Sequence, residues 1–294
     1  MAHPNKPIIY LKSTLLVLFV MVSAIPVNAQ QSKHMKNATT TGYAPVNGLK
    51  MYYEIYGEGS MPLVLIHGGG STIETTFGTL LPFLSGYGKL IAVELQAHGR
   101  TADRDAPESF EQDADDVAAL LQYLKIGKAN IFGFSNGGTT TMQIAIRHPE
   151  LVNKIINLSG ASRRDGFMDG FFDGFKGATL DNMPEPLKTA FLDVTPDKNR
   201  LQAMFEKDVA RMVNFTDIPD DVIRSIKVPA LIMVSDQDVM TAEHAVKLSK
   251  LIPGGRLAIL PGLHGSCIGE MGIIKTGSKL PELTAALIED FLND

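Results

Sequence analysis

The sequence predicts an α/β fold, a doubly wound and mostly parallel sheet with helices on both faces. Short runs that are apolar at every position recur along the chain, and amphipathic helical patterns lie between many of them. Fully apolar runs suit strands that are buried on both faces of a parallel sheet. Repeated β-α-β order then favours helices that cover both faces.

The first predicted strand has alternating apolar residues, which is typical of an antiparallel strand at the sheet edge. Six buried runs follow it, and the helix after the second of these runs carries acidic residues early and an apolar face. The predicted strands are Lys50–Tyr56, Pro62–Ile66, Leu90–Leu95, Ile131–Phe134, Ile155–Leu158, Ala230–Val234 and Arg256–Leu260. The predicted helices are Ser109–Leu124, Asn136–Arg147, Ala242–Leu251 and Pro281–Leu292.

The N-terminus has the pattern of a secretory signal peptide. Lys6 and Lys12 precede a short apolar run, and small residues end at Ala29. We expect cleavage after Ala29, so that residues 1–29 form the signal and the protein is exported to the periplasm or secreted from a bacterium. An uncleaved anchor is the alternative, but the run is short for a bilayer. Residues 30–41 are polar and expected to be flexible, and residues 42–294 form the domain.

The composition of the chain limits the kinds of binding partner that we expect for the protein. The chain has 294 residues and a net charge of −5 without a basic stripe, so no nucleic-acid partner is expected. The only cysteine, Cys267, cannot form an intramolecular disulfide and is expected to be a small buried residue. No cluster of His, Asp or Glu has the spacing of a metal site, and no cofactor is expected. The expected partner is a small ester or lactone, with no stable membrane insertion and the oligomeric state left open.

Residues 161–227 interrupt the alternation of strands and helices, because they contain helical and loop patterns and no buried strand. We expect a small helical lid here. A repeat of Asp-Gly-Phe would place Phe167, Phe171 and Phe175 on one face of a helix that its glycines weaken. This stripe either packs on the body or lines an apolar pocket.

A candidate nucleophile lies at the junction of a strand and a helix. Gly133-Phe134-Ser135-Asn136-Gly137 follows the G-x-S-x-G pattern, in which serine occupies a sharp turn between two small neighbours. Serine needs a general base, and the expected chain order is serine, then an acid, then histidine. The order favours His264, which lies just beyond a predicted strand, over His244, which lies in a predicted helix.

Two carboxylates compete for the role of the acid that orients His264. Asp236 lies at the tip of a predicted strand, where it can cap the turn. Asp238 lies further into the loop, where it can turn toward the imidazole.

The oxyanion of the reaction needs backbone N–H donors. One is expected from Asn136 at the helix N-terminus, and the other from Gly69, with Gly70 as second choice. His67, which begins this glycine-rich loop, is expected to be structural. The residues expected to contact the substrate are Gly70, Phe134, Phe171 and Phe172.

These motifs resemble those of the single-domain bacterial α/β-hydrolases, from about Met51 to the C-terminus. This group holds esterases, enol-lactonases, C–C bond hydrolases and cofactor-free haloperoxidases. The resemblance rests on His67-Gly68-Gly69, the segment from Glu94 to Thr101, the turn at Ser135, and Asp236-Gln237-Asp238 followed by Gly262-Leu263-His264. It implies an α/β-hydrolase fold with a small helical lid and a Ser135-His264-Asp238 triad, since the second Asp of this pattern is usually the acid. Glu94 and Ala97 depart from the family's usual Asp and Gly, at positions that are not catalytic, and His98 is then structural.

The resemblance implies a serine hydrolase that cleaves carboxylic esters through an acyl-enzyme. Ser135 excludes the dehalogenase and epoxide hydrolase chemistry of similar proteins, which needs a carboxylate at that position. A lactonase or a C–C bond hydrolase with the same triad stays open. A proline iminopeptidase is disfavoured by Gly70, where that family has proline, although Asp165, Asp169 and Asp173 could bind an amine. A ligand-binding protein on a hydrolase scaffold is the alternative without enzymatic activity.

Overall fold

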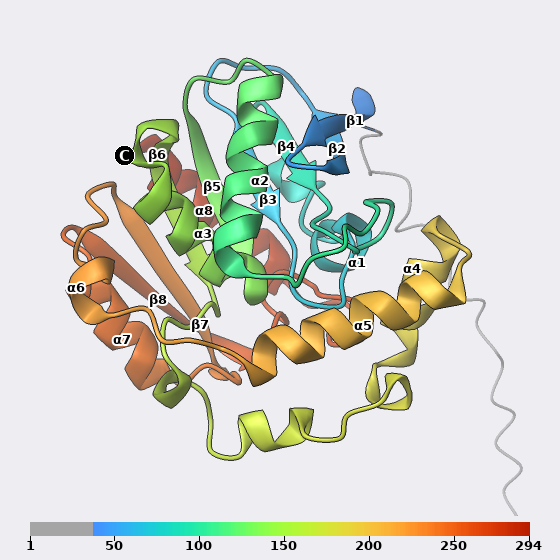
Figure 1. Ribbon diagram of the computed structural model, residues 1–294. Helices are drawn as coiled ribbons and strands as arrows, with labels where there is room; N and C mark the ends of the chain where they lie inside the picture. The colour runs from blue at the N-terminus through green and yellow to red at the C-terminus, as the bar shows by residue number, and fades with distance from the viewer. Residues whose placement is uncertain (1–37) are drawn as a thin grey trace, which may run out of the picture. The chain divides into compact units, whose positions relative to one another are not determined.

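The computed structural model describes residues 38–294. The predicted signal peptide and most of the predicted flexible segment lie outside the described residues, so export stays a prediction. The described chain forms an eight-stranded sheet in the order β1-β2-β4-β3-β5-β6-β7-β8 (Figure 1). β1 pairs antiparallel with β2, and β2 pairs antiparallel with β4. Every other neighbouring pair of strands is parallel. The predicted doubly wound sheet is confirmed.

Each predicted strand is present, with ends that differ by a few residues. The strands that form the parallel part are β3 (Leu63–Ile66), β4 (Leu90–Val93), β5 (Ala129–Phe134), β6 (Val152–Leu158), β7 (Ala230–Gln237) and β8 (Gly255–Leu263). Both β7 and β8 extend three residues beyond their predicted C-terminal ends, which carries their loops further over the edge of the sheet.

The first strand was not predicted. β1 (Thr40–Val46) pairs with β2 (Leu49–Tyr56) through a two-residue turn at Asn47 and Gly48, whose φ angles are 45° and 83°. The prediction that residues 30–41 are flexible is therefore wrong for Thr40 and Thr41, which pair with Ile55 and Glu54. Asn-Gly is the preferred sequence for such a turn, because both positions need a positive φ.

Helices cover both faces of the sheet. Val64 and Ile66 of β3 belong to one apolar core with residues of α2 (Phe110–Tyr123), α3 (Asn136–Arg147) and α7 (Ala242–Leu251). Leu63 and Leu65 pack with α1 (Ile73–Phe77) and α8 (Leu280–Asn293) on the opposite face. Alternate residues of one strand thus enter two separate cores, as the fully apolar runs predict.

The segment between β6 and β7 contains helices and, within the described residues, no strand of the sheet. Its α-helices are α4 (Glu185–Val194), α5 (Lys198–Val213) and α6 (Asp220–Ile223). The prediction of one helix with a phenylalanine stripe is wrong, because Arg164–Gly166 and Phe171–Phe175 form two short 3-10 helices separated by Gly170 at φ 77°. The rings of Phe167 and Phe171 still stack at 4.5 Å, so they form a cluster through the turn instead of along a helix.

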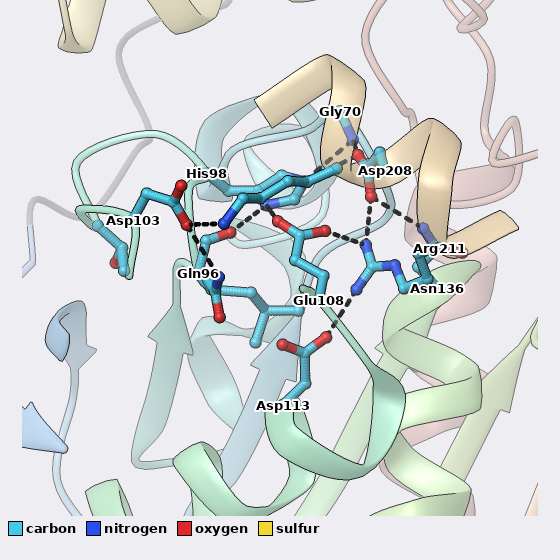
Figure 2. A network of polar contacts seen from close by, with 12 residues as sticks. Gly70, Gln96, His98, Asp103, Glu108, Asp113, Asn136, Asp208 and Arg211 are labelled. Atoms are coloured by element: carbon cyan, nitrogen blue, oxygen red, sulfur yellow. Dashed lines mark hydrogen bonds and ion pairs between the residues drawn. The ribbon is translucent and has the colours of Figure 1, made fainter. Parts of the chain in front are cut away.

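A buried ionic cluster attaches α5 to the body of the domain (Figure 2). Arg211 of α5 donates to Asp113 at 2.8 Å, forms an ion pair with Glu108 at 3.4 Å and donates to Asp208, which is one turn earlier. Asp208 in turn accepts from Nε2 of His98 at 3.0 Å. All these side chains are buried or nearly so, so their charges are desolvated and depend on one another for stability.

Charges in the cluster shift one another's protonation. Burial alone lowers the pKa of His98, but the Asp208 and Glu108 carboxylates outweigh it and raise that pKa to about 9. Burial alone raises the pKa of Asp208, yet His98 and Arg211 hold it well below its usual range. Burial raises the pKa of Glu108 more than Arg211 lowers it. His98 is therefore cationic and Asp208 anionic near neutral pH.

The cluster makes the domain sensitive to alkali. A histidine whose pKa is about 9 in the folded state and about 6.5 in the unfolded chain stabilises the fold fully below pH 6.5. This contribution, at most about 3 kcal/mol, is lost as the pH rises through about 9. We expect the Tm of the protein to fall between pH 7 and pH 10 in thermal unfolding followed by circular dichroism.

Asp208→Asn is the matched control for this effect. The variant loses the charge that raises the pKa of His98, so it should have a lower Tm at pH 7 and a smaller further loss at pH 10. An equal loss in both proteins would show that general alkaline unfolding, and not His98, causes the decline.

The turn between β1 and β2 offers a second test of the fold. An alanine at Gly48 meets no atom within 4 Å but must adopt a positive φ, so strain alone should reduce the free energy of unfolding by about 1 kcal/mol. Gly127 also has no atom within 4 Å and has an ordinary φ, so Gly127→Ala should be neutral or slightly stabilising. Urea unfolding of both variants measures the difference, and equal stabilities would contradict it.

Candidate active site

Ser135 lies on the turn between β5 and α3 in a strained backbone conformation, with φ 55° and ψ −119°. The turn is so tight that a Cβ on Gly133 would lie 1.9 Å from the carbonyl oxygen of Gly137. A Cβ on Gly137 would lie 2.3 Å from the carbonyl oxygen of Ile66. Glycine is therefore required on both sides of the serine, as the motif predicts.

A continuous chain of hydrogen bonds links three of the predicted residues. Nε2 of His264 lies 3.0 Å from Oγ of Ser135, and Nδ1 of His264 lies 2.6 Å from Oδ1 of Asp238. His264 follows β8 and Asp238 follows β7, so two neighbouring parallel strands deliver them to the edge where β5 ends. This is the edge at which α/β proteins bind ligands.

The structure distinguishes the two candidate acids. Asp238 also accepts from Oγ of Ser159 at 2.6 Å, and its pKa is lowered because hydrogen bonds and the charge of His264 outweigh the effect of burial. Asp236 is exposed and accepts from the N–H of Gly262 at 2.7 Å, so it holds together the ends of β7 and β8. Ser159, which supports Asp238 from the end of β6, was not identified from the sequence.

The predicted donors for the oxyanion meet beside Ser135. Within residues 38–294, neither the N–H of Asn136 nor the N–H of Gly69 donates to another residue. The N–H of Gly70, the second choice, instead donates to Asp208 at 2.5 Å. A Cβ on Gly69 would lie 2.5 Å from Nδ2 of Asn136, so a larger residue here would displace the Asn136 amide.

A cavity of about 350 Å³ opens at Ser135 between the body and the segment 161–227. Its wall is mainly apolar. The apolar side chains that line it include Phe167, Phe171, Phe175, Met183, Leu187, Met204, Phe205, Val209, Met212 and Val239.

Two of the residues expected to contact the substrate line this cavity and two do not. Gly70 and Phe171 are in the wall. Phe134 is buried and packs its ring on that of His264 at 4.7 Å. Phe172 lies under the guanidinium of Arg164 at 3.6 Å and is not among the lining residues. Substrate contact by Phe134 and Phe172 therefore stays a prediction that the lining of this cavity does not support.

Asp208 is a second residue of this site, besides Ser159, that was not identified from the sequence. It lines the cavity and contacts both the N–H of Gly70 and, at 3.3 Å, Nδ2 of Asn136 (Figure 2). The sequence carried one signal, the spacing of Asp208 and Arg211 by three residues in a helical pattern, which brings opposite charges together. Nothing in that spacing indicated burial.

Other polar residues of the motifs have structural partners. Nδ1 of His67 forms a hydrogen bond with the carbonyl oxygen of Gly68 in the same loop, and Nε2 accepts one from the N–H of Leu95. His244 packs in the interior, where it accepts from the N–H of Ser162 at 3.1 Å. Burial raises the pKa of the Cys267 thiol to about 12.

Residues 38–294 contain no group of three or more His, Cys, Asp or Glu residues that could hold a metal ion. None of the helices in this range is both long and apolar enough to cross a bilayer.

Comparisons with known proteins agree with the fold. The family model described as the alpha/beta hydrolase fold matches residues 61–187. The human serine hydrolase BPHL is 28% identical, with 77% of this chain and 81% of that protein covered. A 2-hydroxy-6-oxo-6-(2'-aminophenyl)hexa-2,4-dienoic acid hydrolase of Metapseudomonas resinovorans is 30% identical over 45% of this chain and 46% of its own.

A solved structure agrees over most of the domain. The enol-lactonase from Burkholderia xenovorans LB400 superposes with a TM-score of 0.67 at 24% identity, covering 86% of this chain and all (100%) of that one. Both kinds of similarity confirm the expected resemblance, and the chain has the α/β-hydrolase fold.

Proposed function

We propose that the protein is a serine hydrolase that cleaves small or medium-sized apolar carboxylic esters through an acyl-enzyme. The observation that supports this most is the hydrogen-bonded chain from Asp238 through His264 to Ser135, which ends at an apolar cavity. A hydroxyl, an imidazole and a carboxylate in this order are the groups that acyl transfer to water requires.

In the proposed reaction, Oγ of Ser135 attacks the ester carbonyl while Nε2 of His264 takes its proton. The ionised Asp238 holds His264 in the tautomer that can accept this proton and stabilises the imidazolium that forms. The N–H groups of Gly69 and Asn136 donate to the oxyanion, helped by the N-terminus of α3. His264 then protonates the leaving alcohol, and water attacks the acyl-enzyme by the same route in reverse.

Several observations bear on the alternatives. A lactone has the same reacting carbonyl, so a lactonase remains the second candidate. An iminopeptidase would need an acidic clamp for the substrate amine. Asp165 and Asp173 pair with Arg163 and Lys176 near the surface and do not line the cavity. Asp208 does line it, but its charge is already paired with His98 and Arg211. A pure ligand-binding role is disfavoured because His264 lies within hydrogen-bonding distance of both Ser135 and Asp238.

Removal of the nucleophile is the primary test. Ser135→Ala should lower kcat on p-nitrophenyl butyrate by about 10⁴-fold or more and abolish labelling by a fluorophosphonate. Labelling of the native protein without hydrolysis of short p-nitrophenyl esters would overturn the ester assignment. No labelling of the native protein, or equal labelling of both proteins, would favour a binding role.

Asp238 and Asp236 provide a matched pair for the acid. Asp238→Asn should reduce kcat by about 10³- to 10⁴-fold, because an amide at this position favours the wrong tautomer of His264. Asp236→Asn keeps an oxygen that accepts from Gly262, so it should cost less than about 10-fold. Similar losses in the two variants would contradict the assignment of Asp238.

A further inference from the structure

We propose that Asp208 makes this cavity discriminate against substrates that carry a second, free carboxylate. The inference rests on the proposed ester hydrolysis and specifies its substrate class. Asp208 comes from the helical segment between β6 and β7, in which the sequence showed no catalytic motif.

The lining of the cavity carries no cation to receive an anionic group. Among the described residues that line it, no lysine or arginine is present, and Asp208 is the only carboxylate. The other polar side chains are Ser135, Asn136, Thr139, Ser159, Asn182 and His264. A carboxylate that enters must therefore lose its water without gaining an ionic partner, which is unfavourable.

The helix N-terminus cannot serve as that partner. The N-terminus of α3 favours negative charge at Asn136, but in the proposed reaction the oxygen of the scissile carbonyl occupies this position. The N–H of Gly70, the next donor in the loop, is already bonded to Asp208. A second anionic group of the substrate thus finds these backbone donors taken.

The charge of Asp208 also repels a second carboxylate of the substrate directly, in addition to the cost of desolvating that carboxylate. His98 and Arg211 hold its pKa low, so the carboxylate is ionised throughout the neutral range. A cavity of about 350 Å³ is roughly 9 Å across if it is spherical. A charged group inside it therefore lies within about 9 Å of Asp208, which is part of its wall. At that separation, two like charges disfavour each other by about 20-fold at an effective dielectric constant near 20.

The cations of the cluster reduce this repulsion without cancelling it. Arg211 does not line the cavity, and neither does His98, whereas Asp208 does. The cluster therefore presents its negative end to the substrate. We expect a net discrimination of about 5- to 20-fold against the anion from this source.

The experiment compares two substrates of nearly equal shape, the mono-p-nitrophenyl ester of adipic acid and the corresponding primary amide. Wild-type protein should hydrolyse the amide-terminated ester with a kcat/KM at least 10-fold higher than the carboxylate-terminated one. In Asp208→Asn this ratio should fall to about 3-fold or less, or invert, because Arg211 and His98 lose their anionic partner. Hydrolysis by Ser135→Ala gives the background for each ester.

Asp113→Asn is the matched control variant. It removes an ion pair from the same Arg211 but lies outside the cavity lining, so the ratio should stay at the wild-type value. Each ratio is measured within one protein, so a general loss of folding or activity does not alter it. If Asp208→Asn does not fold, the wild-type ratio still tests the selectivity.

The outcomes separate this inference from the proposed function. Equal kcat/KM for the two esters in wild-type protein would overturn the inference while leaving ester hydrolysis in place. An unchanged high ratio in Asp208→Asn would show that Asp208 is not its cause. Failure of wild-type protein to hydrolyse either ester, or p-nitrophenyl butyrate, would overturn the proposed function itself.

Discussion

The close approach of strand, helix and loop around Ser135 is the constraint on which the rest of the site depends. The backbone at Ser135 has a positive φ that a non-glycine residue rarely adopts, and the fold must compensate for this strain. The compensation comes from dense packing. A Cβ on Gly138 would lie 2.9 Å from the Cα of Gly160, so α3 lies directly against the loop that follows β6. A larger side chain at either glycine would separate α3 from this loop. Ser135 would then lose its position above the edge of the sheet.

From this point the geometry of the site follows from the sheet. β5, β6, β7 and β8 are neighbours and parallel, so the residues after them share one edge. Ser135, Ser159, Asp238 and His264 come from these four strand ends in that order. Hydrogen bonds link Ser159 to Asp238, Asp238 to His264, and His264 back to Ser135. The bond from Asp236 to Gly262 joins the last two strand ends and limits how far the loop of His264 can move.

Sequence reasoning succeeded where a residue's role follows from its neighbours in the chain. Runs such as Pro62–Ile66 are apolar throughout because both faces are buried, and the glycines around Ser135 identify a turn that only they allow. It failed where the deciding contact is distant in the chain. Asp208 is buried because His98 and Arg211 neutralise it, and His98 is 110 residues away. The burial of Phe134 has the same cause, since the imidazole that covers its ring comes from the loop after β8.

The position of Asp208 ties the ionic cluster to the proposed chemistry. An anion beside Gly70 and Asn136 would by itself oppose the negative charge that develops on the substrate oxygen, since both charges would lie in a poorly solvated site. The cations of Arg211 and His98 offset part of that effect, and they do so from positions that do not line the cavity. The same ion pairs attach α5 to the body, so the helix that covers the site is held by the charges that keep the oxyanion donors effective. A change that releases α5 would therefore also disturb the electrostatic field at Ser135, because the Asp208 carboxylate takes part in these ion pairs and also lines the cavity.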